Sequence, residues 1–314
     1  MPALDKVVVV TRKTALEELV QRFNTRDQAR FYVEHMGASF AEYQAAHDTY
    51  HAAIAKLRGA IPIGVRSQWI DREFLPTFTF GPHDLIVTIG NDGLVVNTAK
   101  YLDEQPLLAL NPDRARVDGV LVPFAVGGAH SAIRGALAGT FPIRRVTMAR
   151  AELNDGQTLY AVNDLFIGQK SHVSARYSMR YRGREESQSS SGVIVSTGAG
   201  STGWLRSMLT GAVGVVQAFP EGKNAWPIRD KYQFDWEADY LVYSVREPFV
   251  SKLSAAGLCF GRVELGEALE IVSQMPQNGV IFSDGVEEDN LAFNSGAIAR
   301  VGVAQRKLHL IGFK

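Results

Sequence analysis

The hydrophobic pattern changes once along the chain, and this change constrains the fold more than any other feature. Up to about residue 110, apolar runs of strand length alternate with longer stretches of helical period. From about Phe141 onward, short segments that alternate polar and apolar residues take over. The first pattern predicts a Rossmann-like, doubly wound α/β domain with ligand-facing loops at the carboxyl edge of its sheet, and the second predicts a mainly β domain.

Each part of the pattern gives a set of expected elements. In the first part, the expected strands are Lys6–Val10, Ile61–Val65, Asp84–Ile89 and Pro106–Leu110, and the expected helices are Ala15–Arg22, Gln28–Glu34, Ser39–Leu57 and Leu94–Tyr101. In the second part, the expected strands are Arg144–Ala149, Thr158–Val162, Ser174–Arg180, Gly192–Ser196, Tyr240–Val245, Ala268–Val272 and Leu308–Gly312, with a helix at Leu205–Ala218 and a surface loop at Phe219–Asn224. The joint is expected near Pro123–Gly128, which divides residues 1–125 from residues 126–314 and leaves open a return of the C-terminal tail to the first domain.

Size and charge exclude several classes of protein. A chain of 314 residues with 46% hydrophobic and 21% charged residues has the ordinary composition of a globular protein, with room for two domains. A formal net charge of zero gives no general attraction to nucleic acid or to an anionic membrane. The apolar run Val7–Val10 is too short for a signal peptide or a membrane span, so a cytoplasmic protein is expected. The single cysteine, Cys259, excludes an internal disulfide and a cysteine-rich metal site, and we expect it in the core.

A first glycine turn, Thr88-Ile-Gly-Asn-Asp-Gly93, follows an expected strand and opens an expected helix. Backbone amides at such a turn can face phosphate, with the carboxylate of Asp92 beside them. This arrangement suits a phosphoryl-transfer or nucleotide site. The turn alone is a weak signal, because Asn-Asp-Gly also serves well in hairpins and at helix starts.

A second glycine-rich segment, Ser189-Ser-Ser-Gly-Val-Ile-Val-Ser-Thr-Gly-Ala-Gly-Ser-Thr-Gly-Trp204, surrounds another apolar run. Its small residues allow close backbone approach and offer many hydrogen-bonding groups, although such turns also occur as mere connections. Between the two segments, Asn163 and Asp164 interrupt the apolar run Leu159–Ile167. Buried polar groups at that point need partners, either in a structural network or on a bound ligand.

Taken in order, these three segments resemble the NAD kinase family. The family is marked by a Gly-Gly-Asp-Gly turn, an Asn-Glu pair on a strand, and a glycine- and threonine-rich segment that ends in small residues and an aromatic. Its mitochondrial-type branch resembles the chain more closely. The matching segments are Val162–Gly168, Ser190–Gly192, Ser244–Pro248, Phe293–Ala299 and the histidine-containing helical stretch Phe31–His51. The resemblance covers nearly the whole chain.

The resemblance implies a fold, partners and a reaction. The N-terminal α/β domain and the largely β C-terminal domain would enclose a cleft for NAD and for ATP with Mg²⁺, in a homodimer or higher oligomer. Asp92 matches the catalytic aspartate, which would take the proton from the adenosine 2′-hydroxyl as that oxygen attacks the γ-phosphate of ATP. Gly90, Asn91 and Gly93 would complete the phosphate turn. No residue is expected to hold a metal ion by itself.

The resemblance also implies residues that contact the dinucleotide. Asn163 and Asp164 would hold NAD through its hydroxyls and base. Trp204 matches an aromatic that can reach the site of a neighbouring subunit. Further contacts match Ala199, Thr202, Gly203 and Ser207.

Three positions depart from the family pattern. Asn91 replaces the second glycine of the turn; asparagine tolerates positive φ better than most residues, but it adds bulk where phosphate would approach. Asp164 replaces glutamate and loses one methylene of reach, so that a contact could be mediated by water. Ser191 stands where many relatives carry aspartate, but the mitochondrial-type branch resembles the chain there.

Three functions therefore compete. The first is an NAD kinase that makes NADP from NAD and ATP. The second, motivated by Asn91 and Asp164, is a catalytically weak relative that binds a nucleotide as a sensor. The third is a kinase with another acceptor, since the wider superfamily includes diacylglycerol and sphingosine kinases; the segment around Asn163 argues against it. The sequence leaves open ATP against polyphosphate as donor and NAD against NADH as acceptor.

Overall fold

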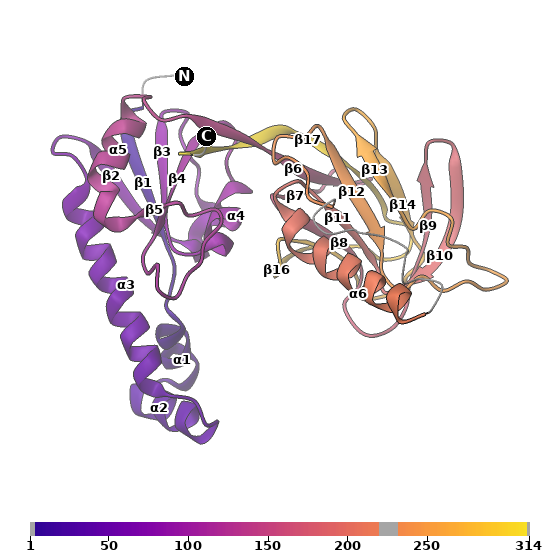
Figure 1. The fold of residues 1–314 in the computed structure, drawn as a ribbon, viewed down its shortest axis with the longest axis horizontal. Helices are drawn as coiled ribbons and strands as arrows, with labels where there is room; N and C mark the ends of the chain where they lie inside the picture. Colours follow the sequence, from indigo (N-terminus) through magenta and orange to yellow (C-terminus); the bar gives the residue numbers. More distant parts are fainter. Residues whose placement is uncertain (1–3, 220–231, 313–314) are drawn as a thin grey trace. The chain divides into compact units, whose positions relative to one another are not determined.

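The structure is a computed structural model that describes residues 4–219 and 232–312. Within these residues the chain divides into two compact units, the first made of residues 4–144 and 309–312 and the second of the remainder (Figure 1). The division lies further along the chain than the expected joint at 125, because α5 (Ala129–Leu137) packs its buried face into the core of the first unit. The expected loop Phe219–Asn224 lies outside the described residues after Phe219.

The first unit is an α/β layer structure built on a parallel sheet. Its strands lie in the order β4-β3-β1-β2, and a short fifth strand, β5, pairs with β4. The bounds are β1 Lys6–Thr11, β2 Arg66–Asp71, β3 Asp84–Ile89, β4 Pro106–Asn111 and β5 Phe124–Ala125. Between the strands run α1 Ala15–Phe23, α2 Arg26–His35, α3 Phe40–Ala60, the short η1 Arg72–Thr77, α4 Asp92–Ala99, and then η2 Val126–Gly128 and α5.

The core of the first unit explains why its central strands are continuous apolar runs. Val7 and Val9 of β1 pack with β3 and β4 residues against α3 and α5. Val8 and Val10 point to the opposite face of the sheet and are equally buried. Strands that are covered on both faces lose the alternation of polar and apolar residues.

One expected strand in this unit is wrong. Residues 61–65 form a turn around Gly64, which has a φ of +88°, and Ile63 is fully exposed. The strand that pairs with β1 is instead β2, in which Arg66, Ser67 and Gln68 are exposed. An edge strand with one open side has no need of an apolar sequence, and for this reason the hydrophobic pattern missed it.

Helices α1 and α2 pack against the N-terminal part of α3 and form a helical arm that extends from the sheet (Figure 1). A small core of Leu16, Val33 and Phe40 holds the three helices together. The start of α1 is fixed by a capping box, in which the Thr14 hydroxyl accepts a hydrogen bond from the Glu17 amide and the Glu17 carboxylate accepts one from the Thr14 amide. We call α1, α2 and α3 the helical arm below.

The second unit is mainly β, and two sheets enclose its core. One is a six-stranded antiparallel sheet in the order β13-β12-β11-β8-β15-β16; the other contains β10-β9-β14-β17 together with β6 and β7. The bounds are β6 Ile143–Leu153, β7 Thr158–Ala161, β8 Asp164–Gln169, β9 Ala175–Tyr181, β10 Arg184–Ser190, β11 Val193–Ser196, β12 Tyr240–Val245, β13 Phe260–Glu264, β14 Leu269–Ser273, β15 Gly279–Ser283, β16 Val286–Ala292 and β17 Ile298–Ile311. After β11 come η3 Gly200–Thr202 and α6 Trp204–Ala218. Cys259 is half-buried and packs against the core between the sheets.

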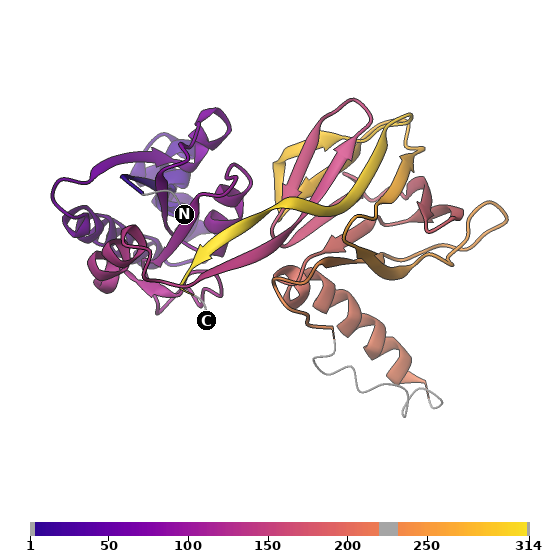
Figure 2. The same ribbon diagram turned by 90° about the horizontal axis from the view of Figure 1, so that it is seen from above.

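The chain passes from one unit to the other within β6 and within β17, and these two strands pair side by side (Figure 2). The last residues of β17, His309 and Leu310, pair in parallel with Pro106 and Leu107 of β4. The expected closing strand at 308–312 is thus the end of a much longer strand.

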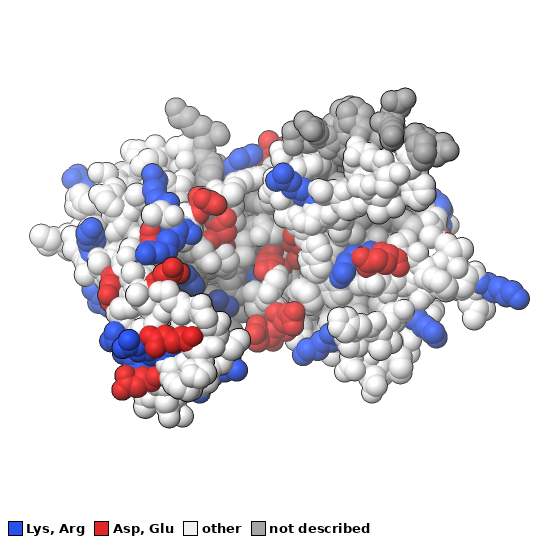
Figure 3. Space-filling model, turned by 60° about the horizontal axis from the view of Figure 1, so that its bottom comes forward, with Lys and Arg blue, Asp and Glu red and all other residues white. Residues whose placement is uncertain are grey.

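The expected fold class, an α/β domain followed by a mainly β domain, is confirmed. Basic and acidic side chains are interspersed on the face drawn in Figure 3, in keeping with the balanced net charge. Among the described helices, none combines the length and the apolar character needed to cross a bilayer.

Candidate functional site

The first glycine turn joins β3 to α4 in the first unit. The Gly90 amide donates to the carbonyl of Leu110 on the neighbouring strand, at 3.0 Å. Asn91 caps α4, because its Oδ1 accepts a hydrogen bond from the Leu94 amide at 3.3 Å. The φ of Asn91 is −102°, an ordinary value, so this position makes no use of the tolerance of asparagine for positive φ.

Asp92 is the first residue of α4, and a neighbouring loop holds its carboxylate. The amides of Val120 and Leu121 donate to its two oxygens, each at 2.9 Å. The residue is half-buried. Each carboxylate oxygen has a second lone pair, so Asp92 can still accept from a hydroxyl or bind a cation. Its geometry fits catalysis, and it also fits a structural role in anchoring the loop.

Arg12 is a site residue that sequence analysis missed. It follows β1, and its Nε lies 3.6 Å from the position that a Cβ on Gly90 would take. This nitrogen is buried and has no hydrogen-bond partner among the described residues. A buried donor without a partner is uncommon in folded proteins, and a cation beside a glycine turn suits an anionic ligand. The signal available in the sequence was a basic residue at the carboxyl end of a central parallel strand.

Tyr50 of α3 forms hydrogen bonds with both Arg12 and the end of the strand that leads into the glycine turn. Its hydroxyl accepts a hydrogen bond from the Arg12 amide at 3.0 Å and donates one to the Ile89 carbonyl at 3.2 Å. Burial raises the pKa of Tyr50 to about 12, so the hydroxyl remains a donor at physiological pH. Through Tyr50, helix α3 is thereby hydrogen-bonded to Arg12, just before α1, and to Ile89, just before Gly90 of the glycine turn.

In the second unit, Asn163 and Asp164 lie where β7 ends and β8 begins. A residue that sequence analysis missed, Asp284, fixes this break: its carboxylate accepts hydrogen bonds from the amides of Val162, Asn163 and Asp164 at 3.1, 2.7 and 3.3 Å. Asp284 and Gly285 both have positive φ, 55° and 73°, in the tight turn between β15 and β16. An Asp-Gly pair between two strand-like segments is a hairpin signal that could have located this turn.

The side chain of Asp164 is buried, with 8% of the residue exposed, and its Oδ1 has no hydrogen-bond partner in the described part of the chain. Burial raises the pKa of Asp164 to about 7, the Ser196 hydroxyl opposes this rise, and the charge of Asp284 adds to it. A buried carboxyl group that titrates near neutral pH and lacks a partner is characteristic of a ligand site.

The second glycine-rich segment packs its backbone directly against this strand break. A Cβ on Gly200 would lie 2.2 Å from the Asn163 carbonyl oxygen, so only glycine fits there. The Thr197 amide donates to the same carbonyl at 2.9 Å. This packing brings Ala199, Thr202 and Gly203 close to the pair predicted to bind the dinucleotide.

The predicted residues of this segment differ in exposure. Ala199 is buried, whereas Thr202, Gly203 and Ser207 are exposed at the start of α6. The Ser207 hydroxyl donates to the Gly203 carbonyl at 3.3 Å. The four turn residues, Gly90 to Gly93, lie in the first unit. The seven residues predicted to contact the dinucleotide all lie in the second unit: Asn163, Asp164, Ala199, Thr202, Gly203, Trp204 and Ser207.

Trp204 packs within its own chain. Its ring stacks on Phe166, with centroids 5.7 Å apart, and on Phe282 at 6.4 Å, while the Arg246 guanidinium lies 5.4 Å from the ring. The three aromatics line a cavity of about 310 Å³, into which Lys170 and Arg246 also face. Aromatic faces beside two cations suit a planar base that carries phosphate groups.

Comparison with known proteins gives a result for structure but none for sequence. No protein-family model matches the chain, and no curated protein matches it. The crystal structure of yeast NADH kinase complexed with NADH is similar, with a TM-score of 0.60 and 14% identity, over 100% of this chain and 85% of the other. The crystal structure of an NAD kinase from Archaeoglobus fulgidus in complex with ATP is also similar, with a TM-score of 0.56 and 14% identity, over 98% of this chain and 93% of the other. The chain has the fold of NAD kinases.

Proposed function

We propose that this protein is an NAD kinase, which transfers the γ-phosphoryl group of ATP to the adenosine 2′-hydroxyl of NAD and so makes NADP. The observation that carries the proposal is the position of Asp92. A carboxylate at the start of α4, oriented by two backbone amides, lies in the glycine turn beside Arg12, whose buried Nε has no hydrogen-bond partner among the described residues. A base and a phosphate-binding cation at one turn are two of the groups that phosphoryl-transfer sites use.

The first unit would bind the phosphates and accept the proton. The amides at the start of α4 and the guanidinium of Arg12 would bind phosphate oxygens. As the 2′-oxygen bonds to the γ-phosphorus and the bond from that phosphorus to the bridging oxygen of ADP breaks, Asp92 would take the hydroxyl proton. ADP is the leaving group.

Mg²⁺ fits this chemistry as an ion carried by ATP. The turn offers one carboxylate with free lone pairs, Asp92, whereas the Asn91 oxygen is already used as the cap of α4. A single carboxylate together with substrate phosphates and water is a common ligand set for Mg²⁺. When bound, the ion would neutralise charge on the phosphates.

The second unit would bind the dinucleotide. Asn163 and ionised Asp164 would accept hydrogen bonds from ribose hydroxyls, with Ala199, Thr202, Gly203 and Ser207 as further contacts. Trp204 would offer its ring to a base. We assign the chain to the mitochondrial-type branch of the family on the motifs given above, and we expect the protein in the cytoplasm. We also expect a homodimer, and sedimentation velocity at micromolar concentration tests this oligomeric state.

A coupled assay tests the reaction. Purified protein, NAD, ATP and Mg²⁺ should yield NADP, detected with an NADP-specific dehydrogenase; replacing NAD by NADH and ATP by polyphosphate identifies the acceptor and the donor. Absence of NADP, and of NADPH where NADH is the acceptor, under every one of these conditions contradicts the proposal.

A second candidate is a nucleotide sensor without turnover. The observation that favours it is the bonding of Asp92, since both of its oxygens already hold the loop at Val120 and Leu121. Tight binding of NAD in calorimetry, without any NADP formed, identifies a sensor. Phosphorylation of a lipid alcohol in place of NAD identifies the third candidate.

A further inference from the structure

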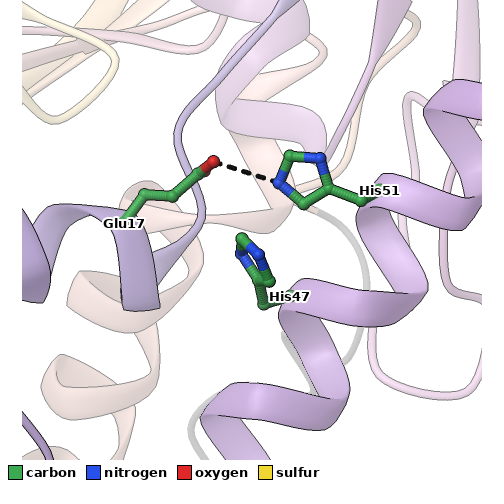
Figure 4. Close-up of side chains that lie close together, drawn as sticks. All are labelled: Glu17, His47 and His51. Carbon is green, nitrogen blue, oxygen red and sulfur yellow. Dashed lines mark hydrogen bonds and ion pairs between the residues drawn. The ribbon is translucent and has the colours of Figure 1, made fainter. Parts of the chain in front are cut away.

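Three side chains that can bind a metal ion meet between α1 and α3 in the helical arm (Figure 4). Glu17 comes from α1, and His47 and His51 come from α3. The two histidines are four residues apart, which puts them on the same face of the helix. One ligand atom from each of the three residues lies within 4.8 Å of the others.

Hydrogen bonds already orient two of the three ligands. The Thr14 hydroxyl lies 2.9 Å from Nδ1 of His47, so Nε2 is the nitrogen with which His47 would bind an ion. Oε2 of Glu17 accepts from the Thr14 amide at 2.7 Å, and its Oε1 lies 3.0 Å from Nε2 of His51. Nε2 is free to bind an ion when Nδ1–H donates to the Thr14 hydroxyl, and histidine ligands usually donate the N–H of their second nitrogen to an oxygen in this way.

The cluster is open to solvent, and among the described residues no lysine or arginine forms an ion pair with its carboxylate. The side chains of His51 and Glu17 are 45% and 36% exposed, which gives an ion access and leaves room for bound water. The closest basic side chain in sequence, Lys13, is directed elsewhere, since its ammonium pairs with Glu73 at 2.9 Å and with Gln21 at 3.0 Å.

We propose that Glu17, His47 and His51 bind one divalent transition-metal ion of the Zn²⁺ class, with water in the remaining position. Two imidazoles and one carboxylate are a frequent ligand set for Zn²⁺, with bonds of about 2.0–2.2 Å. Tetrahedral ligand atoms at that bond length are about 3.3 Å apart. The ligand atoms of the three side chains must therefore approach one another by rotation of the side chains when the ion binds. Mg²⁺ is a poor occupant, because it prefers oxygen ligands.

Such an ion would do more than join two helices. Tyr50 precedes His51 on α3 and holds both the Arg12 amide and the Ile89 carbonyl. An ion that holds α3 against α1 would therefore also restrict the motion of Arg12 and of the residue that precedes the glycine turn, Ile89. The site is separate from any ion that accompanies ATP, and the inference does not depend on the proposed function.

The test is metal binding by protein without an affinity tag, stripped with EDTA and dialysed. We expect one equivalent of Zn²⁺ per chain by mass spectrometry of the metal, visible absorption of tetrahedral Co²⁺ when that ion is added instead, and a rise in Tm with Zn²⁺. His47→Ala, His51→Ala and Glu17→Gln should each weaken Zn²⁺ binding by at least about 100-fold, measured against a competing chromogenic chelator. No NAD or ATP is present, so the result is independent of kinase activity.

His35→Ala is the matched control, because His35 lies at the end of α2 in the same arm and stacks only on Phe31 among the described rings. It should bind Zn²⁺ as wild type does. If His47→Ala fails to fold, His51→Gln at the exposed position provides the same test, with folding checked by circular dichroism. Less than a tenth of an equivalent of Zn²⁺ on the wild-type protein, or unchanged binding in the folded ligand variants, overturns the proposal.

Discussion

Asp92 in the first unit and Asp164 in the second are the same type of residue, the first at the start of helix α4 and the second at the start of strand β8, but their surroundings are opposite. Both oxygens of Asp92 accept backbone hydrogen bonds, and the residue is half-exposed. Asp164 is buried, and one of its oxygens has no partner among the described residues. The first environment holds a carboxylate in place, and the second makes protonation easy. Under the proposed function, the first unit would supply a positioned base and the second a binding group that responds to pH.

The largest effect is expected at Asp92, where one substitution tests both the catalytic role and the structural role of anchoring the loop. Asp92→Asn should lower turnover by about 10²- to 10⁴-fold, because a general base contributes a factor of that order. The new amide also cannot accept from both Val120 and Leu121, so we expect a loss of about 1–3 kcal/mol in unfolding free energy. NADP formation and urea denaturation measure the two effects. Asp118→Asn, an exposed residue of the same loop, is the control and should change neither; a folded Asp92→Asn protein with more than a tenth of normal turnover contradicts the assignment.

The second prediction tests Asp164 through pH. Its pKa in the folded protein, about 7, lies above the ordinary value of 3.8, so the folded state binds the proton more tightly than the unfolded state. The stability that this proton contributes is complete below pH 3.8 and is lost as the pH rises through about 7. The full difference amounts to at most about 4 kcal/mol.

Asp164→Asn should therefore be more stable than wild type at pH 8 and equally stable near pH 4, in urea denaturation at both values. Asp155 is the control, because hydrogen bonds from Gln157 lower the pKa of its exposed carboxyl group instead. Asp155→Asn should give no gain at pH 8. A difference between Asp164→Asn and wild type that is the same at both pH values would show that Asp164 does not titrate in this range.

The third prediction concerns Arg12, which the proposed function assigns to the phosphates of ATP. Hydrogen bonds to charged groups contribute about 1.5–3 kcal/mol, so Arg12→Gln should raise the KM or Kd for ATP by about 10- to 100-fold. Binding of NAD should change little, because the predicted NAD residues lie in the second unit. Arg30→Gln, an exposed ion-pair variant on α2, is the control for charge. Loss of NAD affinity equal to that for ATP would break the division of roles between the units.

The smallest effect is expected at Asn91. Asn91→Gly removes the side-chain cap of α4, and glycine at such a position costs only a few tenths of a kcal/mol. Because the side chain points to the Leu94 amide, the KM for ATP should stay within about twofold of wild type, given a free-energy change of that size. A larger fall in KM, measured in the same coupled assay, would show that asparagine obstructs the phosphate turn.

Local patterns predicted the parts of this molecule that depend on local physics. The elements up to α4, apart from β2 and η1, and the positions of both glycine segments followed from apolar runs and turn residues. The pattern did not predict β2, whose exposed edge carries no apolar signal, or the helix α5. Asp284 and Arg12 join the site only through contacts made across the fold, the first more than a hundred residues away from Asn163. The Glu17, His47 and His51 cluster was missed for the same reason, since it forms only when α1 packs on α3.

The turn between β15 and β16 has a consequence for local opening. Three successive amides, those of Val162, Asn163 and Asp164, are protected from solvent by the single carboxylate of Asp284. When the tip of this hairpin opens, all three lose their acceptor in one event. Their hydrogen–deuterium exchange should therefore report one common free energy of opening, that of a hairpin that contains none of them. Local opening at Asn163 and Asp164, which would hold a dinucleotide, thus depends on a hairpin more than a hundred positions further along the chain.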